Sequence, residues 1–387
     1  MSDAPRGSTT PQRRLPGALT PLDVASGLLL KQLAPVPPRL VPLAEAHGRY
    51  GAPSRETAAS LPRRHTATCD GWALHAADIV GASSYAPVPL TTPLHWIEAG
   101  EALPDGADCV VDPAAVDLAG PLPLIVLESF PGENIRRAGQ DLAESWLADF
   151  EGRKLDALDL LAAEHAGLAH VPIRVPRVAL VDIPSRSGTR ATVSLIERLA
   201  RAAGADVSRG SAQDRGIDAT AEALRAVADT DLILTVGGTG GGREDHAVDA
   251  LERAGHVLAH GLALRPGSTA AVGSSGARPV IALPGMPDQA LAVWWTLVEP
   301  ALESLSAARP MSPMAWPLER KIASSIGLAE IVLLAQRDRR FDPLATGDLP
   351  LQRLREATHV YVVRGDSEGC APGTEVQARP IRMDLLQ

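Results

Sequence analysis

The sequence predicts several domains, of which one is a doubly wound α/β domain and the others are rich in β-strands. The chain has 387 residues, more than one hydrophobic core normally serves. Between residues 176 and 306, apolar strands alternate with amphipathic helices, a pattern typical of a mostly parallel sheet with helices on both faces. Elsewhere, short apolar pieces are separated by proline and glycine turns, which is typical of small β-sheets.

The composition and net charge of the chain argue against several classes of binding partner. Hydrophobic residues make up 45% of the chain, the net charge is −9 and the pI is about 5.6, so the sequence lacks the basic footprint of a nucleic-acid binder. The three widely spaced cysteines suit a reducing compartment and argue against a zinc site. The apolar run ALAVWWTLV is too short to cross a bilayer, and no secretory signal is apparent. We therefore expect a cytoplasmic protein with no membrane segment and no nucleic-acid partner.

The first elements belong to a tail and a helical linker domain. Residues 1–18 contain arginine, proline and serine without an apolar core, which predicts a disordered tail. TPLDVASGLLLKQLA predicts a helix with Thr20 as its N-cap and Pro21 at its first position. LDALDLLAAEHAGLAHV predicts a second helix that stops at Gly167. We assign residues 19–55 and 140–175 to this helical linker domain.

A β-rich domain is expected over residues 56–139. Short apolar pieces such as RLVPLA, PVPL and LPLIVLESF alternate with turns between residues 38 and 130. This pattern predicts small antiparallel sheets.

The α/β domain covers residues 176–306. Strands are expected at 178–183, 205–207, 231–236 and 279–285, helices at 192–204, 218–229, 245–255 and 287–305, and a hairpin at 263–273. The proline-rich stretch 308–317 is interpreted as a linker. Residues 359–381 predict two strands around a glycine-rich turn, which places a β-barrel-like domain at residues 312–387.

A glycine-rich loop, TVGGTGGGREDH at residues 235–246, is the candidate binding element. It follows a buried strand and opens a helix, as LPGMP does at residues 283–287, so both loops should lie at the carboxyl edge of one sheet. Helix N-termini and side-chain-free amides at such an edge favour an anionic ligand. The loop has neither the lysine of a P-loop nor the GxGxxG spacing of a dinucleotide fold. A flexible connection is the alternative, although Asp245 can cap the helix or hold a cation.

Nine sequence blocks occur in an order that resembles a known family. They are VPLAEAHGRY, ATCDGWALHAADI, ALPDGADCVV, PGENIRRAGQDL, VALVDIPSRSG, SAQDRG, TVGGTGGGREDH, HGLALRPGSTAAVG and VIALPGMPDQAL. This series is similar to the molybdopterin molybdenumtransferase family, which includes MoeA and the gephyrin E-domain, and it extends from about Thr20 to Ile381.

The resemblance implies an elongated, multi-domain MoeA-like subunit that forms a homodimer, with the site between one subunit's α/β domain and the other's β-rich domain. It implies insertion of molybdenum from molybdate into adenylylated molybdopterin, with release of AMP and assistance from Mg²⁺. It also implies a client molybdoenzyme or an adenylyltransferase as a protein partner.

The family's motif positions can be carried over residue by residue. The resemblance implies catalytic roles for Asp70, Asp141 and Asp245, and metal binding by Asp214 and Asp245. The substrate-binding positions that it implies are Gly237, Gly238, Thr239, Gly240, Gly242, Arg265, Ser268, Pro284, Gly285 and Arg186.

Several of these positions depart from the family's pattern. Arg186 stands where the family has an acidic residue, Ala99 where it has a threonine, and Arg265 and Ser268 where it has lysines. The loss of one transition-state contact typically costs about 10²–10³ in rate. Three hypotheses therefore remain open: an active insertase, a molybdopterin-binding carrier, chaperone or regulator for a molybdoenzyme, and other nucleotide chemistry such as adenylylation.

Overall fold

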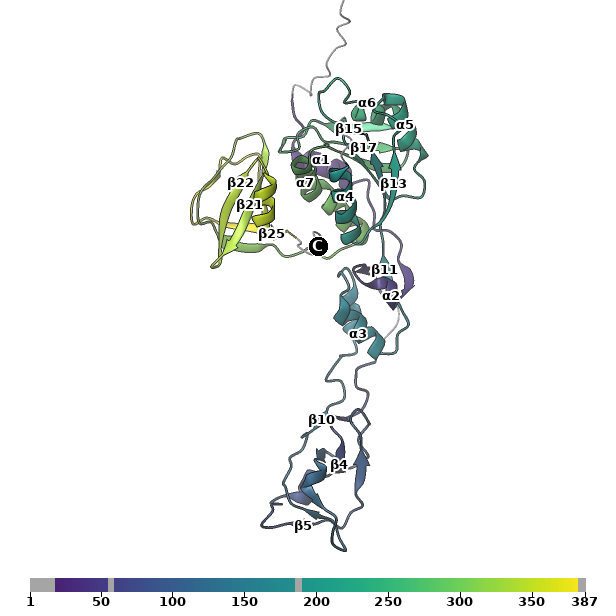
Figure 1. The fold of residues 1–387 in the computed structure, drawn as a ribbon, viewed down its shortest axis with the longest axis vertical. Helices are drawn as coiled ribbons and strands as arrows, with labels where there is room; N and C mark the ends of the chain where they lie inside the picture. The colour runs from purple at the N-terminus through teal and green to yellow at the C-terminus, as the bar shows by residue number, and fades with distance from the viewer. Residues whose placement is uncertain (1–17, 55–58, 185–189, 382–387) are drawn as a thin grey trace, which may run out of the picture. The chain divides into compact units, whose positions relative to one another are not determined.

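Two structural units make up the part of the chain that the computed structural model describes, namely residues 18–54, 59–184 and 190–381 (Figure 1). The larger unit contains the described parts of Met1–Ala52, Gly152–Asp156 and Pro172–Gln387. The smaller unit contains the described parts of Pro53–Glu151 and Ala157–Val171. The predicted tail at residues 1–18 lies almost wholly outside the described residues.

The larger unit is built around a mixed six-stranded sheet with the order β13-β12-β14-β18-β17-β15. The first four strands are parallel, whereas β17 and β15 run antiparallel to their neighbours. The predicted mostly parallel sheet is thus confirmed. The strands are β12 (Arg177–Asp182), β13 (Asp206–Ser211), β14 (Leu232–Val236), β15 (His256–His260), β17 (Ala271–Ser275) and β18 (Arg278–Leu283).

Helices cover both faces of this sheet, as a doubly wound fold requires. Alternate residues of β12 enter different cores, because successive side chains of a strand point to opposite faces. Val178 and Leu180 join a cluster with α4, α7 and α8, whereas Ala179 and Val181 join one with α5 and α6. The helices are α4 (Ala191–Ala202), α5 (Ile217–Ala226), α6 (Ala247–Ala254), α7 (Pro287–Val293) and α8 (Glu299–Ser306).

The long helix expected at residues 287–305 is interrupted by a π-helical segment, η4 (Trp294–Val298), between α7 and α8. Pro300, in the first turn of α8, has no N–H with which to continue the α-helical ladder, and a wider turn accommodates this loss. The Thr296 hydroxyl donates to the Ala292 carbonyl at 2.7 Å.

The C-terminal part of the larger unit is a second sheet, ordered β16-β21-β23-β25-β19, with β22 paired to β21. Its first strand, β16 (Leu264–Arg265), comes from the α/β domain. The linker interpretation of residues 308–317 is wrong for its second half, because β19 pairs with β25 there. The other elements are β19 (Met314–Pro317), β20 (Ile322–Ala323), β21 (Ala329–Arg337), β22 (Arg340–Thr346), α9 (Leu351–Glu356), β23 (His359–Val363), β24 (Gly369–Cys370) and β25 (Glu375–Pro380).

The N-terminal elements of the larger unit include a helix and a small sheet with the order β1-β11-β2. The helix begins one residue later than predicted: Pro21 precedes it, and Thr20 instead forms a β-bridge with Leu262. The elements are α1 (Leu22–Leu30), β1 (Arg39–Pro42), α2 (Leu43–Ala46), β2 (Tyr50–Gly51) and β11 (His170–Arg174), whose first two residues belong to the smaller unit.

The smaller unit consists of short antiparallel strands, as the sequence predicts. They form the sheets β6-β4-β7, β5-β9-β8 and β10-β3. Gly167 has a φ of +78° and follows the helix α3, so its predicted role as a helix stop is confirmed. The elements are β3 (Thr66–Ala67), β4 (Gly71–Leu74), η1 (Ala76–Ile79), β5 (Val88–Pro89), β6 (His95–Ile97), β7 (Cys109–Val111), η2 (Pro113–Ala115), β8 (Val116–Asp117), β9 (Leu124–Ile125), β10 (Ile135–Arg136), η3 (Trp146–Phe150) and α3 (Ala157–His165). Within the described residues, no helix is both long and apolar enough to cross a membrane.

A buried histidine in the second sheet predicts a dependence of stability on pH. His359 is 4% exposed, packs on the Phe341 ring, and has a pKa below its usual value because burial disfavours the charged form. The unfolded chain therefore binds more protons than the folded chain just below the ordinary histidine pKa, and stability falls as the pH falls through this window. We expect His359→Gln to reduce the loss of melting temperature between about pH 7.5 and pH 5. An equal loss in the variant and the wild type would contradict this assignment.

Candidate functional site

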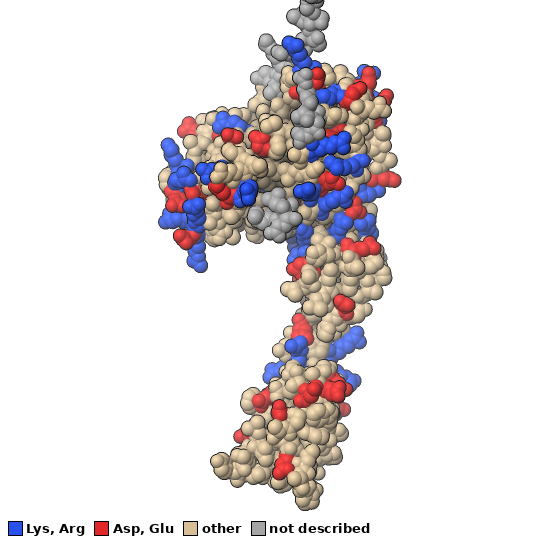
Figure 2. All heavy atoms as spheres, viewed as in Figure 1, with Lys and Arg blue, Asp and Glu red and all other residues tan. Residues whose placement is uncertain are grey.

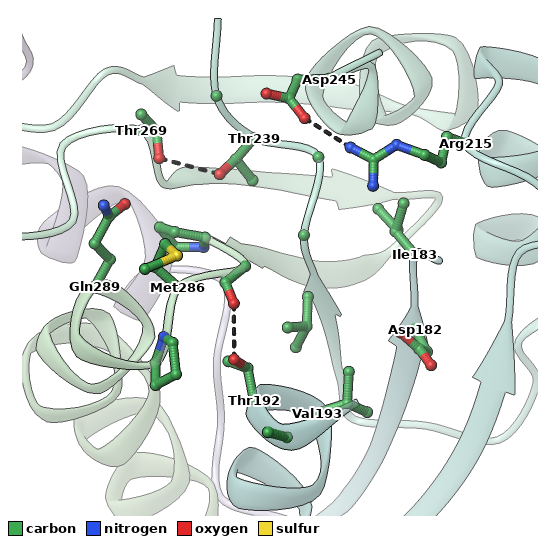
Figure 3. A pocket seen from close by; sticks show the side chains of 18 residues that line it. Asp182, Ile183, Thr192, Val193, Arg215, Thr239, Asp245, Thr269, Met286 and Gln289 are labelled. Carbon is green, nitrogen blue, oxygen red and sulfur yellow. Dashed lines mark hydrogen bonds and ion pairs between the residues drawn. The ribbon is translucent and has the colours of Figure 1, made fainter. Parts of the chain in front are cut away.

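A pocket of about 470 Å³ lies at the carboxyl ends of β12, β14 and β18 (Figure 3). Its lining comes mainly from the ends of these three strands, the segments that follow them and the first turns of α4 and α7, and it is completed by Arg215 after β13 and Thr269 before β17. The two loops that the sequence places at one sheet edge therefore meet, as predicted. The lining residues are Asp182, Ile183, Ala191, Thr192, Val193, Arg215, Val236, Gly237, Gly238, Thr239, Gly240, Asp245, Thr269, Pro284, Gly285, Met286, Pro287 and Gln289.

The glycine loop needs glycine at its first two positions. Gly237 and Gly238 have φ values of +101° and +68°, a left-handed region that residues with a Cβ atom rarely adopt. A Cβ atom on Gly237 would lie 3.3 Å from the Ile183 carbonyl oxygen. The loop is fixed at both ends, because the Gly237 N–H donates to the Leu283 carbonyl and the Ala247 N–H donates to the Gly238 carbonyl.

Two residues of this loop that line the pocket, Thr239 and Gly240, have backbone donors without an acceptor in the described part of the chain. The Thr192 hydroxyl, in the first turn of α4, donates to the Gly285 carbonyl at 2.7 Å and links this helix to the loop after β18 (Figure 3). Free amides and helix N-termini attract negative charge, so the geometry suits a phosphate or a similar anion.

Arg215 and Asp245 form an ion pair at the rim of the pocket. The Arg215 Nη2 atom donates to Asp245 Oδ1 at 2.9 Å, and its Nη1 atom donates to the Pro184 carbonyl at 2.6 Å. The other carboxylate oxygen of Asp245 accepts the Gly242 N–H at 3.0 Å. Arg215 also lies 3.6 Å from a carboxylate oxygen of Glu244. This arginine therefore holds the glycine loop against the end of β12.

Asp182 places a second carboxylate in the pocket lining. It is the last residue of β12 and is only 5% exposed. Its Oδ2 atom lies 3.1 Å from the Arg190 Nε atom, yet no described residue donates a well-aligned hydrogen bond to it. The Arg190 side chain is 63% exposed, so one side of this pair faces solvent.

Most of the predicted substrate-binding positions in the α/β domain line the pocket. They are Gly237, Gly238, Thr239, Gly240, Pro284 and Gly285, and Asp245 joins them. Gly242 contacts Asp245 instead, and Ser268 does not line the pocket. The Arg265 guanidinium pairs with Glu330 of the C-terminal sheet. Arg186 lies outside the described residues.

The remaining acidic candidates have local roles in the structure. Asp214 accepts the Gly216 N–H at 2.7 Å, as a turn residue does. In the smaller unit, Asp70 accepts the Ala99 N–H at 2.8 Å and Asp141 pairs with Arg136 at 3.3 Å.

The described pocket residues do not supply a complete set of side-chain ligands for Mg²⁺. Mg²⁺ prefers several oxygen ligands in octahedral geometry. Both carboxylate oxygens of Asp245 are already occupied, and Asp214 is engaged in its own turn. Within the described part of the chain, no group of three potential metal-ligating side chains occurs.

Sequence reasoning missed several pocket residues. Asp182 appeared only as part of an apolar strand, and Arg215 only as the neighbour of Asp214. Position alone could have identified both, because they follow or end a strand at the carboxyl edge where ligands bind. Thr192, Thr269 and Gln289 gave no comparable signal.

The backbone of the glycine loop yields a prediction with a matched control. Gly237→Ala and Gly276→Ala both place a Cβ atom on a left-handed residue, which should lower stability by about 1–2 kcal/mol in each case, and by somewhat more in Gly237→Ala because only its Cβ atom closely approaches a carbonyl oxygen. Gly276 lies in the turn between β17 and β18, away from the pocket lining. We expect only Gly237→Ala to abolish binding of AMP, measured by calorimetry. Equal loss of binding in both variants would show that the loop has no specific role.

Comparisons with known proteins agree with this geometry. A model described as the MoeA N-terminal region (domain I and II) matches residues 20–167, and one described as a probable molybdopterin binding domain matches residues 190–304. Molybdopterin molybdenumtransferase 2 of Mycobacterium tuberculosis is 28% identical over 304 residues, which cover 68% of this chain and 74% of that relative. The molybdopterin molybdenumtransferase of Synechococcus elongatus is 28% identical over 402 residues, which cover 92% of this chain and 98% of that relative.

Solved structures show the same fold. The molybdopterin biosynthesis moeA protein of Pyrococcus horikoshii OT3 superimposes with a TM-score of 0.70 at 22% identity, covering 93% of this chain and 99% of that one. The two family models match consecutive segments, and the relatives extend over most of the chain. The chain therefore belongs to the MoeA family of molybdopterin molybdenumtransferases.

Proposed function

We propose that this protein inserts molybdenum from molybdate into adenylylated molybdopterin and releases AMP, a step in molybdenum cofactor biosynthesis. The observation that carries the proposal is the pocket at the carboxyl edge of the sheet, where free amides of the glycine loop meet the first turns of two helices. Relatives named as molybdopterin molybdenumtransferases support the same reaction.

The phosphate groups of the substrate bind at the glycine loop. The N–H groups of Thr239 and Gly240 and the guanidinium of Arg215 are the donors for these oxygens. Cleavage of the phosphoanhydride bond increases the negative charge on the leaving phosphate, and fixed donors stabilise that charge more than the ground state. Exposed Lys and Arg side chains also gather over α4 and β13 on the face shown in Figure 2, where they attract an anionic ligand.

The catalytic carboxylates are Asp245, Asp70 and Asp141, as the resemblance implies. Asp245 acts within the pocket, and we propose that Asp70 and Asp141 act from the second subunit of a homodimer. Asp214 and Asp245 would hold Mg²⁺ in the scheme that the resemblance implies. Because the described residues do not supply a complete set of side-chain ligands, we assign no step to the metal.

A cytoplasmic location remains a prediction from the sequence. Transfer of the product to a molybdoenzyme client, and delivery of the substrate by an adenylyltransferase partner, are part of the same proposal.

The test is a single-turnover assay with the purified full-length protein, adenylylated molybdopterin and molybdate. We expect AMP release and a product that carries molybdenum and activates a molybdenum-free molybdoenzyme. Binding of the adenylylated substrate without AMP release would refute the insertase proposal and support the carrier hypothesis. A second incubation, with molybdopterin and ATP, tests the third hypothesis: formation of adenylylated molybdopterin would support adenylylation chemistry.

A further inference from the structure

Asp182 is a buried acid that phosphate binding in this pocket does not require. It lines the pocket at the end of β12 and is 5% exposed, and its Oδ2 atom lacks a well-aligned hydrogen bond from any described residue. A buried carboxylate in this condition is costly unless donors satisfy it. The negative charge of Asp182 would also repel the anionic part of a ligand. The one charged neighbour of Asp182 among the described residues is Arg190, whose side chain is 63% exposed, so a ligand group that donates hydrogen bonds would satisfy the carboxylate on the pocket side.

The two ring systems of adenylylated molybdopterin, the pterin and the adenine, differ in the hydrogen-bond donors that they present. The pyrimidine edge of a pterin presents two adjacent donors, the ring N–H and the exocyclic amino group. The corresponding edge of adenine presents one donor and one acceptor. A carboxylate offers two acceptors and no donor, so it pairs with the pterin edge through two parallel hydrogen bonds and cannot satisfy the adenine edge.

The walls of the pocket next to Asp182 suit a flat ring. Ile183, Val193 and Val236 line the same cavity and supply apolar surface from the residue after β12, the first turn of α4 and the end of β14. Arg215 and the glycine loop form other parts of its lining, as the labelled side chains in Figure 3 show. A single ligand can therefore place a ring against Asp182 and a phosphate against the loop.

We propose that Asp182 is the specificity-determining residue that binds the pterin edge of the substrate and orients the pterin, not the adenine, in this pocket. The proposal rests on the proposed function and names the part of the substrate that this pocket holds. On binding, the two pterin donors satisfy the carboxylate, and Arg190 is released toward solvent or toward the phosphate.

Arg190 provides the control for a purely structural role. If Asp182 served only to anchor the start of α4 through the Arg190 ion pair, removal of either partner would have the same consequence. Arg190 is exposed at the helix N-terminus, so Arg190→Gln removes the pair without leaving a cavity in the core. Asp182→Asn keeps the size of the buried side chain but replaces one acceptor with a donor.

The experiment measures binding of 6-hydroxymethylpterin, through quenching of its fluorescence, and binding of AMP, through calorimetry. We expect Asp182→Asn to weaken pterin binding by about 10- to 100-fold, because one of two charge-assisted bonds is lost and two donors then face each other. AMP binding should stay unchanged or become tighter, because the variant removes a negative charge. Arg190→Gln should leave pterin binding within about threefold of the wild type.

Three results would overturn the proposal: equal pterin affinity in Asp182→Asn and the wild type, an equal loss in Arg190→Gln, or no pterin binding by the wild-type protein. Melting temperatures of all variants control for folding. These results are distinct from failure of the proposed function, which appears as absent AMP release in the turnover assay even when the pterin binds through Asp182.

Discussion

Replacing Arg215 with glutamine is expected to lower kcat/KM for adenylylated molybdopterin by about 10²–10³-fold, the usual cost of one lost transition-state donor. Arg215 is a cation of the pocket lining, and its guanidinium reaches both Asp245 and the Pro184 carbonyl. The substitution removes a phosphate donor and releases the glycine loop from the end of β12. Initial rates of AMP release at several substrate concentrations measure the effect.

Arg215→Lys is the matched control. Lysine retains the charge but not the planar arrangement of donors that contacts two acceptors at once, so we expect an intermediate loss. The Arg215 side chain is about one-fifth exposed, and folding is checked by melting temperature. If Arg215→Gln kept full activity in a folded protein, the phosphate would have to be bound elsewhere.

Replacing Arg265 with methionine is expected to destabilise the larger unit by about 2–4 kcal/mol, the cost of leaving a buried charge without its partner. Glu330 is fully buried in β21, where its Oε1 atom pairs with the Arg265 guanidinium and its Oε2 atom accepts the Ser325 N–H at 3.1 Å. Loss of the arginine leaves this carboxylate uncompensated where β16 pairs with β21. Urea unfolding measures the effect.

The double variant Arg265→Met with Glu330→Leu tests the cause. Removal of both charges eliminates the uncompensated carboxylate, so the double variant should recover most of the lost stability. AMP binding should be retained wherever the protein is folded. A stable Arg265→Met variant that no longer binds AMP would instead support the substrate-binding role that the family resemblance implies.

Elements with a strong local pattern could be predicted from the sequence. The apolar run of β14 and the helical periodicity of α4 identify a buried strand and a helix on one face of a sheet. The second sheet was harder: β21 and β22 form a hairpin whose turn residues, Asp338 and Arg339, have positive φ values without glycine. A rule based on glycine turns cannot detect such a hairpin.

The glycine loop of the site could be predicted from the sequence, because its function depends on the backbone. Residues whose role depends on the contacts of their side chains could not be predicted. Gly237 and Gly238 are predictable because a glycine run after a buried strand allows the backbone to approach a ligand closely, and the structure adds that both have positive φ values. Arg265 shows the opposite case, because its partner Glu330 is far away in the sequence. The same limit applies to Asp182, since burial converts an ordinary strand residue into a carboxylate that faces the pocket.

The most direct test is a crystal structure of the full-length protein with adenylylated molybdopterin. We predict a phosphate within hydrogen-bonding distance of the Thr239 and Gly240 N–H groups and of Arg215, with the pterin edge on Asp182. A substrate bound outside this pocket, for example in the cavity that Leu22 and Arg364 line, would contradict it.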